Sequence, residues 1–380
     1  MKRLSALVAI TLLISPLAGF AQTGVMPQPG EHFAVGTFKI DGLPVVGLVM
    51  GDDDLIVELE AANRALEVNP AYSSVPMPDD MVDLIGRYEY GLKYRLYELA
   101  DWVVAEGQLD RRNRPDYVHE RDDVHVMAPI QYPGKILNAA VNFYSHVNEG
   151  GTPEQRAAEQ RRRREERGVP YLFLKPARGA VIGADDTVII PWGRTMTDWE
   201  VELGAVIGRP AKYVDATNAQ DYIFGYIVTL DISDRGGRPP GGNATSSDWF
   251  VGKGHDTFAP MGPWIVPKEF YGDPMANLRQ TLSVNGEVIQ DAQAGDMIHS
   301  LYEIIEYASS IITLYPADVV NNGTSGGTGG RRDSGQRFLQ SGEVIEASID
   351  GIGTMVIEVE AEPEPPGGTG SRLPPVNTYR

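Results

Sequence analysis

The chain has 380 residues, 42% of them hydrophobic and 22% charged, with a formal net charge of −19. This composition is that of a globular protein with a sizeable core, and the acidic balance argues against a nucleic-acid binder, because phosphate recognition needs a basic surface. The absence of cysteine excludes disulfides, thiolate metal sites and cysteine nucleophiles, and the 42 glycines and 27 prolines favour a turn-rich, sheet-based fold.

Residues 1–21 have the pattern of a secretory signal peptide. Lys2 and Arg3 form a basic start, an apolar segment covers 4–14, and small residues precede Gln22. The apolar segment is too short to cross a bilayer, and no second long apolar run follows it. We therefore expect an exported protein, periplasmic or secreted, without stable membrane insertion.

Residues 22–124 are predicted to form a small N-terminal domain of strands and a helix. Short β-like runs separated by turn signals occupy 33–58. From 81 to 103 the apolar residues recur every three or four positions, which predicts an amphipathic helix. The segment 106–122 is polar and rich in Arg and Asp, so we expect a linker there and a domain boundary near 125.

The second domain is predicted to span 125–360 and to consist mostly of short strands, followed by a Pro- and Gly-rich tail at 361–380. Two helices interrupt the strand pattern. The first, at 152–167, begins with a capping-box sequence but has almost no apolar face. It is either a charged surface helix or a lid whose arginines meet an anionic substrate. An apolar face at 297–312 predicts the second helix.

A His-x-x-Glu pair follows the first apolar strand of the second domain. His146 and Glu149 are three residues apart, so on one helical turn both lie on the same side. A carboxylate beside an imidazole fixes its tautomer and raises its basicity, as a general base acting through water requires. By itself this spacing is more typical of a surface ion pair.

Three carboxylates favour a metal site. Glu200 and Glu202 are two residues apart, so on a strand both point to the same face. Like charges this close repel unless a cation lies between them, and carboxylate oxygens suit Mg²⁺, Mn²⁺ or Ca²⁺. Asp231 lies in an apolar strand pattern, where a buried charge needs a partner. The alternatives are a solvent-facing Glu pair and an Asp that bonds backbone amides or Arg235.

Two Gly-rich segments could contribute to the same chemistry. Lys253 lies between two glycines and is either an ordinary loop charge or a donor to a developing oxyanion. The loop 323–330, Gly-Thr-Ser-Gly-Gly-Thr-Gly-Gly, can present consecutive amides and a hydroxyl to a carboxylate. It lacks the Gly-Lys-Ser/Thr ending of a phosphate-binding P-loop.

The order of these motifs over residues 133–358 resembles the fumarylacetoacetate hydrolase family. The motifs are Asn142-aromatic-x-x-His-x-x-Glu, Phe173-Leu-Lys-Pro, Asp198-x-Glu-x-Glu-Leu, Asp231-Ile-Ser-x-Arg, Gly-Lys253 and Gly323-Thr. The resemblance implies an α+β, β-rich fold with a mixed β-sandwich or β-roll core and a small N-terminal domain, usually as a homodimer. It also implies enzymes that cleave or rearrange C–C bonds next to a carbonyl in small oxo acids and diketones.

The resemblance assigns roles by position. The divalent metal, Mg²⁺ or Mn²⁺, would be held by three carboxylates, Glu200, Glu202 and Asp231. The catalytic groups would be His146 and Glu149, which activate water, and Lys253, which stabilises the oxyanion. The substrate-binding residues would be Asn142, Arg235, Gly323 and Thr324.

These assignments predict a metal-dependent hydrolase that cleaves a C–C bond in an acylpyruvate or a β-diketo acid. Activated water attacks the distal carbonyl, and the other fragment leaves as an enolate that the metal stabilises. One alternative is an oxo-acid decarboxylase or tautomerase with the same metal site, and another is an exported ligand-binding protein without turnover. Phe143, where the family usually has Tyr, and the long Gly- and Pro-rich loop 236–248 leave the substrate open.

Overall fold

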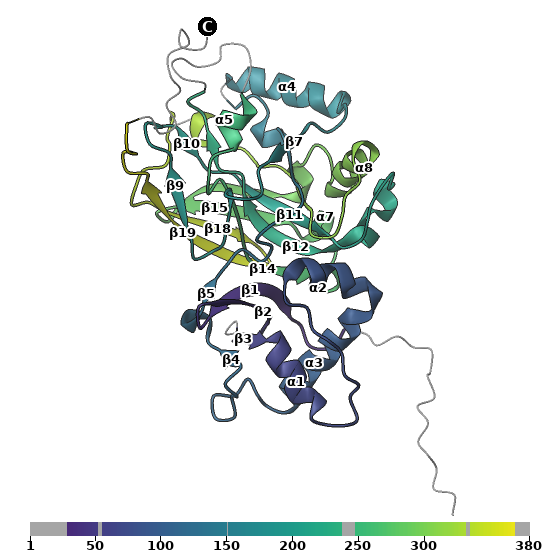
Figure 1. Ribbon diagram of the computed structural model, residues 1–380. Coiled ribbons are helices and arrows are strands. Elements are labelled where there is room, and N and C mark those ends of the chain that lie inside the picture. Colours follow the sequence, from purple (N-terminus) through teal and green to yellow (C-terminus); the bar gives the residue numbers. More distant parts are fainter. Residues whose placement is uncertain (1–28, 52–54, 150, 238–247, 332–334, 369–380) are drawn as a thin grey trace, which may run out of the picture.

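The computed structural model describes residues 29–51, 55–149, 151–237, 248–331 and 335–368. The predicted signal peptide at 1–21 and the tail from 369 onward lie outside these residues. Among the helices of the described part, none is both long and apolar enough to cross a membrane. The chain forms a smaller N-terminal part and a larger part that carries most of the strands (Figure 1).

The N-terminal part is a strand meander covered by helices. Its strands are β1 (Ala34–Ile40), β2 (Leu43–Met50) and β3 (Leu55–Glu58), which pair antiparallel. Its helices are α1 (Leu59–Glu67), α2 (Met81–Arg87), the π-helical turn η1 (Tyr88–Leu92) and α3 (Lys93–Ala105). The helix predicted over 81–103 is therefore present but kinked, because Gly91 has a φ of +119°. The helix α1 was not expected, because the strand-like pattern of 33–58 gives no sign of a helix directly after it.

A 12-stranded sheet runs through both parts of the molecule. Its remaining strands are β4 (Val118–His119), β5 (His125–Val126), β6 (Ile136–Ala139), β7 (Leu172–Lys175), β8 (Val181–Ile182), β11 (Val201–Ile207), β12 (Ile223–Leu230), β14 (Ala259–Pro267) and β17 (Val319–Asn321). The order is β4-β3-β2-β1-β14-β12-β11-β17-β6-β7, with β5 beside β1 and β8 beside β14. Val35 pairs with Ile265 where β1 meets β14, so the sheet is continuous between the two predicted domains.

A second sheet packs on one face of the first. Its five strands are β9 (Thr187–Ile190), β15 (Arg279–Val284), β16 (Glu287–Gln293), β18 (Val344–Ile349) and β19 (Gly353–Ala361), in the order β16-β15-β18-β19-β9. Val201 and Leu203 of β11 share a buried cluster with Leu282 and Ile345 of this sheet. The two sheets thus form a β-sandwich, and the predicted α+β, β-rich class is confirmed.

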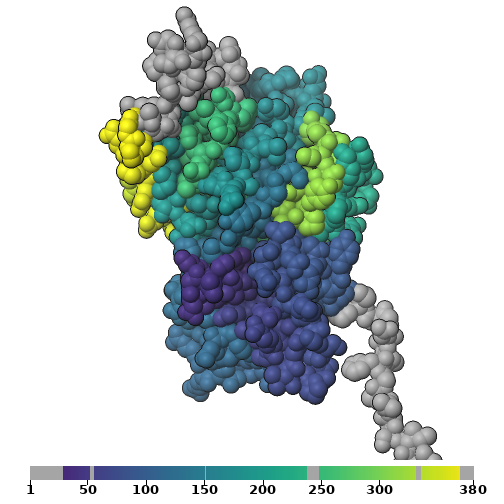
Figure 2. Space-filling model, in the orientation of Figure 1, coloured from purple at the N-terminus to yellow at the C-terminus, as the bar shows by residue number. Residues whose placement is uncertain are grey.

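The opposite face of the large sheet packs against the N-terminal helices. The ring of Tyr88 meets that of Phe224 edge-on, with centroids 4.8 Å apart. The hydroxyl of Tyr88 donates a 2.5 Å hydrogen bond to Glu269, and the hydroxyl of Tyr97 contacts the same carboxylate oxygen. Burial and the nearby Glu269 raise the pKa of both phenols, so both remain donors. Figure 2 shows the N-terminal part, coloured purple to blue, lying directly against the larger part.

Helices and short turns fill the periphery of the larger part. The helices are α4 (Pro153–Glu165), α5 (Trp249–Lys253), α6 (Lys268–Tyr271), α7 (Pro274–Asn277) and α8 (Leu301–Ile311). The 3₁₀ turns are η2 (Arg121–Asp123), η3 (Tyr144–His146), η4 (Ala216–Tyr222), η5 (Ala294–Asp296) and η6 (Gly329–Arg331), and β10 (Thr197–Asp198) pairs with β13 (Ser233–Asp234). The helices predicted at 152–167 and 297–312 are α4 and α8, each starting at a capping box.

Candidate active site

The three predicted metal ligands meet at one end of strands β11 and β12. Glu200 precedes β11, Glu202 lies within it, and Asp231 directly follows β12. Pairing of the two strands brings the acids together, and the Asp231 amide donates a 2.9 Å hydrogen bond to the Glu200 carbonyl. One carboxylate oxygen of each residue lies within 4.8 Å of the others, and all three side chains are buried.

The electrostatics of this cluster favour a divalent cation. Burial raises the pKa of Glu202 well above its usual range, and the charges of Asp231 and Glu200 raise it further. Asn138 donates a 3.0 Å hydrogen bond to Glu202, whereas the described cations near the cluster contact the other two carboxylates, Glu200 and Asp231. Oxygen donors at this spacing suit a hard cation, so the three residues fit a divalent metal site.

Two lysines contact the carboxylates of the cluster. Lys253 donates to Glu200 at 2.8 Å, to the Ser233 hydroxyl at 2.6 Å and to Asp231, so its three ammonium protons are all used. Lys175, which the sequence analysis did not select, contacts the other oxygen of Asp231. Burial lowers the pKa of Lys175 to about 8. The predicted donation of Lys253 to a substrate oxyanion therefore requires one of these contacts to exchange.

Arg235 bridges two acids beside the cluster. Its Nε donates to Asp198 at 2.9 Å, and its Nη2 contacts Glu200. Burial is the largest single influence on Glu200 and raises its pKa, but the charges of Arg235 and Lys253, with that of His146, together outweigh burial, so this pKa lies below its usual range. Burial is also the main cause that raises the pKa of Asp198. The guanidinium of Arg235 thus lines the cavity while its described contacts are with protein carboxylates.

The predicted His–Glu pair is in contact. His146 ends the turn η3, and its Nδ1 lies 2.5 Å from Oε2 of Glu149. Glu149 also accepts hydrogen bonds from the amide of Gly327 and, at 3.0 Å, from the hydroxyl of Thr328. Because Nδ1 faces the carboxylate, Nε2 is the ring nitrogen left for water. His146 lines the same cavity as the three carboxylates.

Two predicted substrate-binding residues hold protein groups. The Thr324 hydroxyl lines the cavity and donates to the Val201 carbonyl at 3.0 Å. Asn142 is buried and donates to the carbonyls of His299 and Asn322 at 2.9 and 2.8 Å. It lines a separate cavity of about 160 Å³, so the structure does not bring its amide to the carboxylate cluster. The substrate contacts of these residues stay predictions.

Glycines shape the loop that carries Thr324. Gly323 and Gly327 have φ values of +89° and +100°. A Cβ at these positions would lie 2.6 and 2.3 Å from carbonyl oxygens, so a larger residue fits at neither. The amide of Gly329 donates a 2.7 Å hydrogen bond to Asp198. The predicted cradle of amides thus exists, and two of its amides hold the protein's own acids, Glu149 and Asp198.

The site opens into a cavity of about 460 Å³. It is lined by the three carboxylates together with Lys253, Arg235 and His146. Apolar residues also line it, among them Val141, Phe173, Met196 and Trp249. The cavity therefore offers a ligand both charged and apolar surface.

Helix α4 lies over the turn that carries the His–Glu pair. Arg156 donates to the Glu149 carbonyl at 3.0 Å, and Gln160 donates to the Tyr144 carbonyl at 2.8 Å. The guanidinium of Arg164 lies 3.9 Å above the Tyr144 ring. These three residues are four apart and so form one stripe of the helix, which has no buried residue. The predicted charged helix is thus attached through polar contacts, and its role as a lid stays a prediction.

Comparisons with known proteins identify chains that are similar to this one. A family model described as fumarylacetoacetate (FAA) hydrolase C-terminal matches residues 135–360. A mitochondrial oxaloacetate tautomerase of Bos taurus is 34% identical over 87% of this chain and 93% of its own length. A 2,4-didehydro-3-deoxy-L-rhamnonate hydrolase of a Sphingomonas species is 35% identical over 60% of this chain and 73% of its own.

A solved structure adds a metal to the comparison. It is the crystal structure of maleylpyruvate hydrolase from Sphingobium sp. SYK-6 in complex with manganese(II) ion and pyruvate. The match covers 87% of this chain and 100% of that one, with 26% sequence identity and a TM-score of 0.62. The likeness therefore spans both the N-terminal and the larger part of the molecule.

Proposed function

Because the chain belongs to the fumarylacetoacetate hydrolase family, we propose that it is a divalent-metal-dependent hydrolase of acylpyruvates or closely related β-diketo acids. The observation that carries the proposal is that His146, backed by Glu149, lines the same cavity as the carboxylate cluster. A base for water beside a site for a Lewis acid is the combination that hydrolysis of a dicarbonyl requires. Family membership alone supports metal-dependent chemistry on acylpyruvate-type compounds.

The proposed reaction is R–CO–CH₂–CO–COO⁻ + H₂O → R–COO⁻ + CH₃–CO–COO⁻ + H⁺. The Nε2 atom of His146 takes a proton from water, and Glu149 stabilises the imidazolium through Nδ1. The new C–O bond forms at the carbonyl next to R, and the bond between that carbon and the CH₂ breaks. The electron pair passes to the pyruvate fragment as its enolate, which is then protonated at carbon.

The cluster of Glu200, Glu202 and Asp231 would hold Mg²⁺ or Mn²⁺, which supplies Lewis acidity to the 2-oxo acid and to the developing enolate. Manganese in a hydrolase of similar fold supports this choice of ions, and Ca²⁺ also suits the donor set. Lys253 and Arg235 neutralise part of the acid cluster. With a carboxylate of the cluster engaged by the metal, Lys253 would have a proton to donate to the substrate oxygen.

A second candidate function is tautomerisation of an oxo acid. It is favoured by the similarity to the mitochondrial oxaloacetate tautomerase of Bos taurus, because the match covers 93% of that protein. The same residues would then move a proton between carbon and the enol oxygen, without attack by water. The decarboxylation of an oxo acid would also use the metal site and would release CO₂.

One assay separates these reactions. Metal-loaded protein is given acetylpyruvate and, separately, oxaloacetate, and pyruvate, CO₂ and the ultraviolet absorbance of the enol are all followed. Hydrolysis predicts stoichiometric pyruvate and acetate from acetylpyruvate, sensitive to EDTA and restored by Mn²⁺ or Mg²⁺. Loss of enol absorbance from oxaloacetate without new products would support tautomerisation. No turnover of either compound would support a binding protein.

Export and dimerisation complete the proposal. We propose that residues 1–21 are removed during export, so that the mature chain starts at Gln22. N-terminal sequencing of the protein recovered from the periplasm or medium tests this directly. The family resemblance supports a homodimer, which light scattering of the mature protein would detect as twice the chain mass.

A further inference from the structure

The cavity beside the carboxylates has an aromatic wall that the proposed chemistry does not use. The ring of Phe173, on the edge strand β7, lies 4.6 Å from that of Trp249, on helix α5, at an interplanar angle of 30°. Both side chains line the cavity, and both are half-buried. The ring of Tyr171 continues the row, 5.9 Å from Trp249. Tyr171 is exposed and lines the separate cavity of about 160 Å³, so of the three rings those of Phe173 and Trp249 line the cavity of the carboxylates.

This wall begins next to the reacting groups. The ammonium of Lys253 lies 5.1 Å from the Phe173 ring centroid, while the same ammonium contacts Glu200 and Asp231. The order is therefore carboxylates, Lys253, Phe173, Trp249. In an acylpyruvate the group R lies two carbons beyond the 2-oxo acid head, so an extended substrate whose head is at the carboxylates carries R toward these rings.

The charges of the residues that line the cavity bear on whether the substrate group R can itself be charged. Among the described residues that line it, Lys253 and Arg235 are the permanent cations, and both already bond protein carboxylates. A carboxylate placed against Phe173 and Trp249 at the far end of the substrate would thus face aromatic rings. Burying that charge without a partner is costly, whereas a planar apolar group stacks favourably.

We propose that Phe173 and Trp249 bind the group R of the substrate, and that R is planar and apolar, an aryl or conjugated alkenyl group, not a second carboxylate. The inference rests on the proposed function for the position of the 2-oxo acid head. It goes beyond that function because it assigns a specificity surface and a class of acyl group.

Binding of unreactive analogues tests the inference apart from turnover. The probes are 2-oxo-4-phenylbutanoate, 2-oxopentanoate and 2-oxoglutarate, which share the 2-oxo acid head and lack the carbonyl that water would attack. Titration calorimetry with the Mn²⁺-loaded protein should give the phenyl compound about tenfold tighter binding than the other two, the value expected for one aromatic stack.

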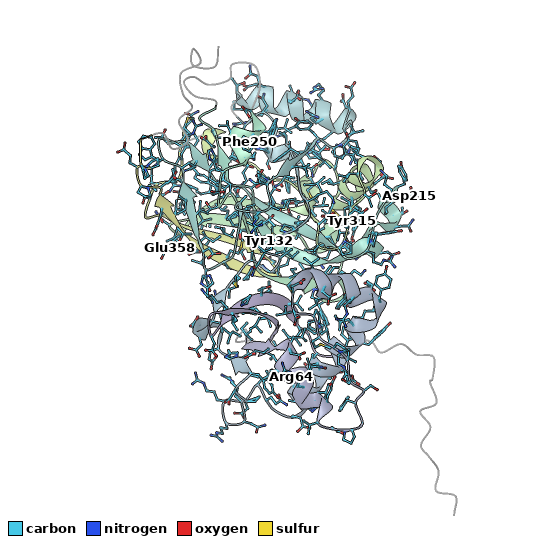
Figure 3. All side chains as sticks on the ribbon, in the orientation of Figure 1. Arg64, Tyr132, Asp215, Phe250, Tyr315 and Glu358 are labelled. Carbon is cyan, nitrogen blue, oxygen red and sulfur yellow. The ribbon has the colours of Figure 1, made fainter. Side chains whose placement is uncertain are left out.

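Variants locate the preference on the wall. In Trp249→Ala and in Phe173→Leu the phenyl advantage should fall to about twofold or less, while Trp249→Phe keeps most of it. Phe250→Ala is the matched control, because Phe250 is the next residue of α5 but is 77% exposed and is not among the residues lining the cavity (Figure 3). Its binding of all three probes should equal that of the parent protein.

The other outcomes contradict the inference, the proposed position of the 2-oxo acid or the proposed hydrolysis. Equal or tighter binding of 2-oxoglutarate, or a phenyl preference that survives in both wall variants, contradicts the inference alone. Failure of all three probes to bind in the presence of Mn²⁺ contradicts the inference, and it also contradicts the proposed binding of the 2-oxo acid head at the carboxylates. A phenyl preference together with no pyruvate from any acylpyruvate supports the wall and rejects hydrolysis.

Discussion

The hydroxyl of Thr328 lies 3.0 Å from Oε2 of Glu149, the oxygen that also faces Nδ1 of His146 at 2.5 Å. The amide of the preceding residue donates to the other oxygen of Glu149, and the amide of the following residue donates to Asp198. Three consecutive residues of one loop therefore hold two acids in place. These are Glu149, which contacts His146, and Asp198, which contacts Arg235. The loop sets the position of the base relative to the metal ligands.

Replacing Thr328 by Val should lower kcat by roughly ten- to a hundredfold, because a hydrogen bond to a charged group contributes about 1.5–3 kcal/mol. KM should change little. The loss of this donor leaves Glu149, which orients the imidazole of His146, less firmly held, so the base is misplaced in the transition state. Thr328→Ser should restore kcat, because it keeps the hydroxyl. A fall in kcat without rescue by Ser would mean that Thr328 only supports the loop.

Replacing Glu202 by Gln should remove metal binding without weakening the metal-free fold. The substitution keeps the side-chain volume and removes a buried carboxyl group. The pKa of that group is raised by burial and by the charges of Asp231 and Glu200. We expect at least a hundredfold loss of Mn²⁺ affinity, measured by calorimetry, and a melting temperature of the metal-free protein that is equal or higher. Undiminished Mn²⁺ affinity would show that the cluster is not the metal site.

Metal uptake by the parent protein should release a proton. Because the pKa of Glu202 is raised in the metal-free state, this group holds its proton below that pKa, and a metal ligand must give it up. Affinity should therefore rise with pH by about tenfold per unit below the raised pKa and level off above it. Calorimetry in two buffers of different ionisation enthalpy measures the release. A pH-independent affinity without proton release would contradict the assignment.

Replacing Glu269 by Ala should destabilise the whole chain. The carboxylate accepts from Tyr88 and Tyr97, and Tyr88 is fully buried, so its hydroxyl would lose its partner. We expect a loss of about 2–4 kcal/mol in the free energy of unfolding, measured in urea. Glu306→Ala, at an exposed position of α8, should change it by no more than about 0.5 kcal/mol. Equal stability of the two variants would show that the contact between the two parts contributes little.

Local spacing was enough to predict several features of the site. Glu200 and Glu202 share a face because strand side chains alternate, and His146 reaches Glu149 because one turn separates them. The capping box at Thr152 likewise predicted the start of α4. The kink at Gly91 was missed, because the apolar periodicity continues through it.

Contacts that depend on sheet order could not be predicted in this way. Lys175 reaches Asp231 from 56 positions earlier in the chain, and Gly329 reaches Asp198 across 131 positions. Nothing in the local pattern distinguishes Lys175 from a lysine that ends a strand in solvent. The family motif Phe-Leu-Lys-Pro contained it, and this motif is the signal that could have marked it.

In the proposed reaction, water activated by His146 attacks an acylpyruvate held at Glu200, Glu202 and Asp231. The decisive experiment is turnover of acetylpyruvate in ¹⁸O-labelled water by the Mn²⁺-loaded protein, read by mass spectrometry of the products. We expect one ¹⁸O from the attacking water to enter the acetate, and EDTA or His146→Ala to suppress acetate formation. Consumption of the enol with no acetate formed would contradict hydrolysis, whatever the metal content of the protein.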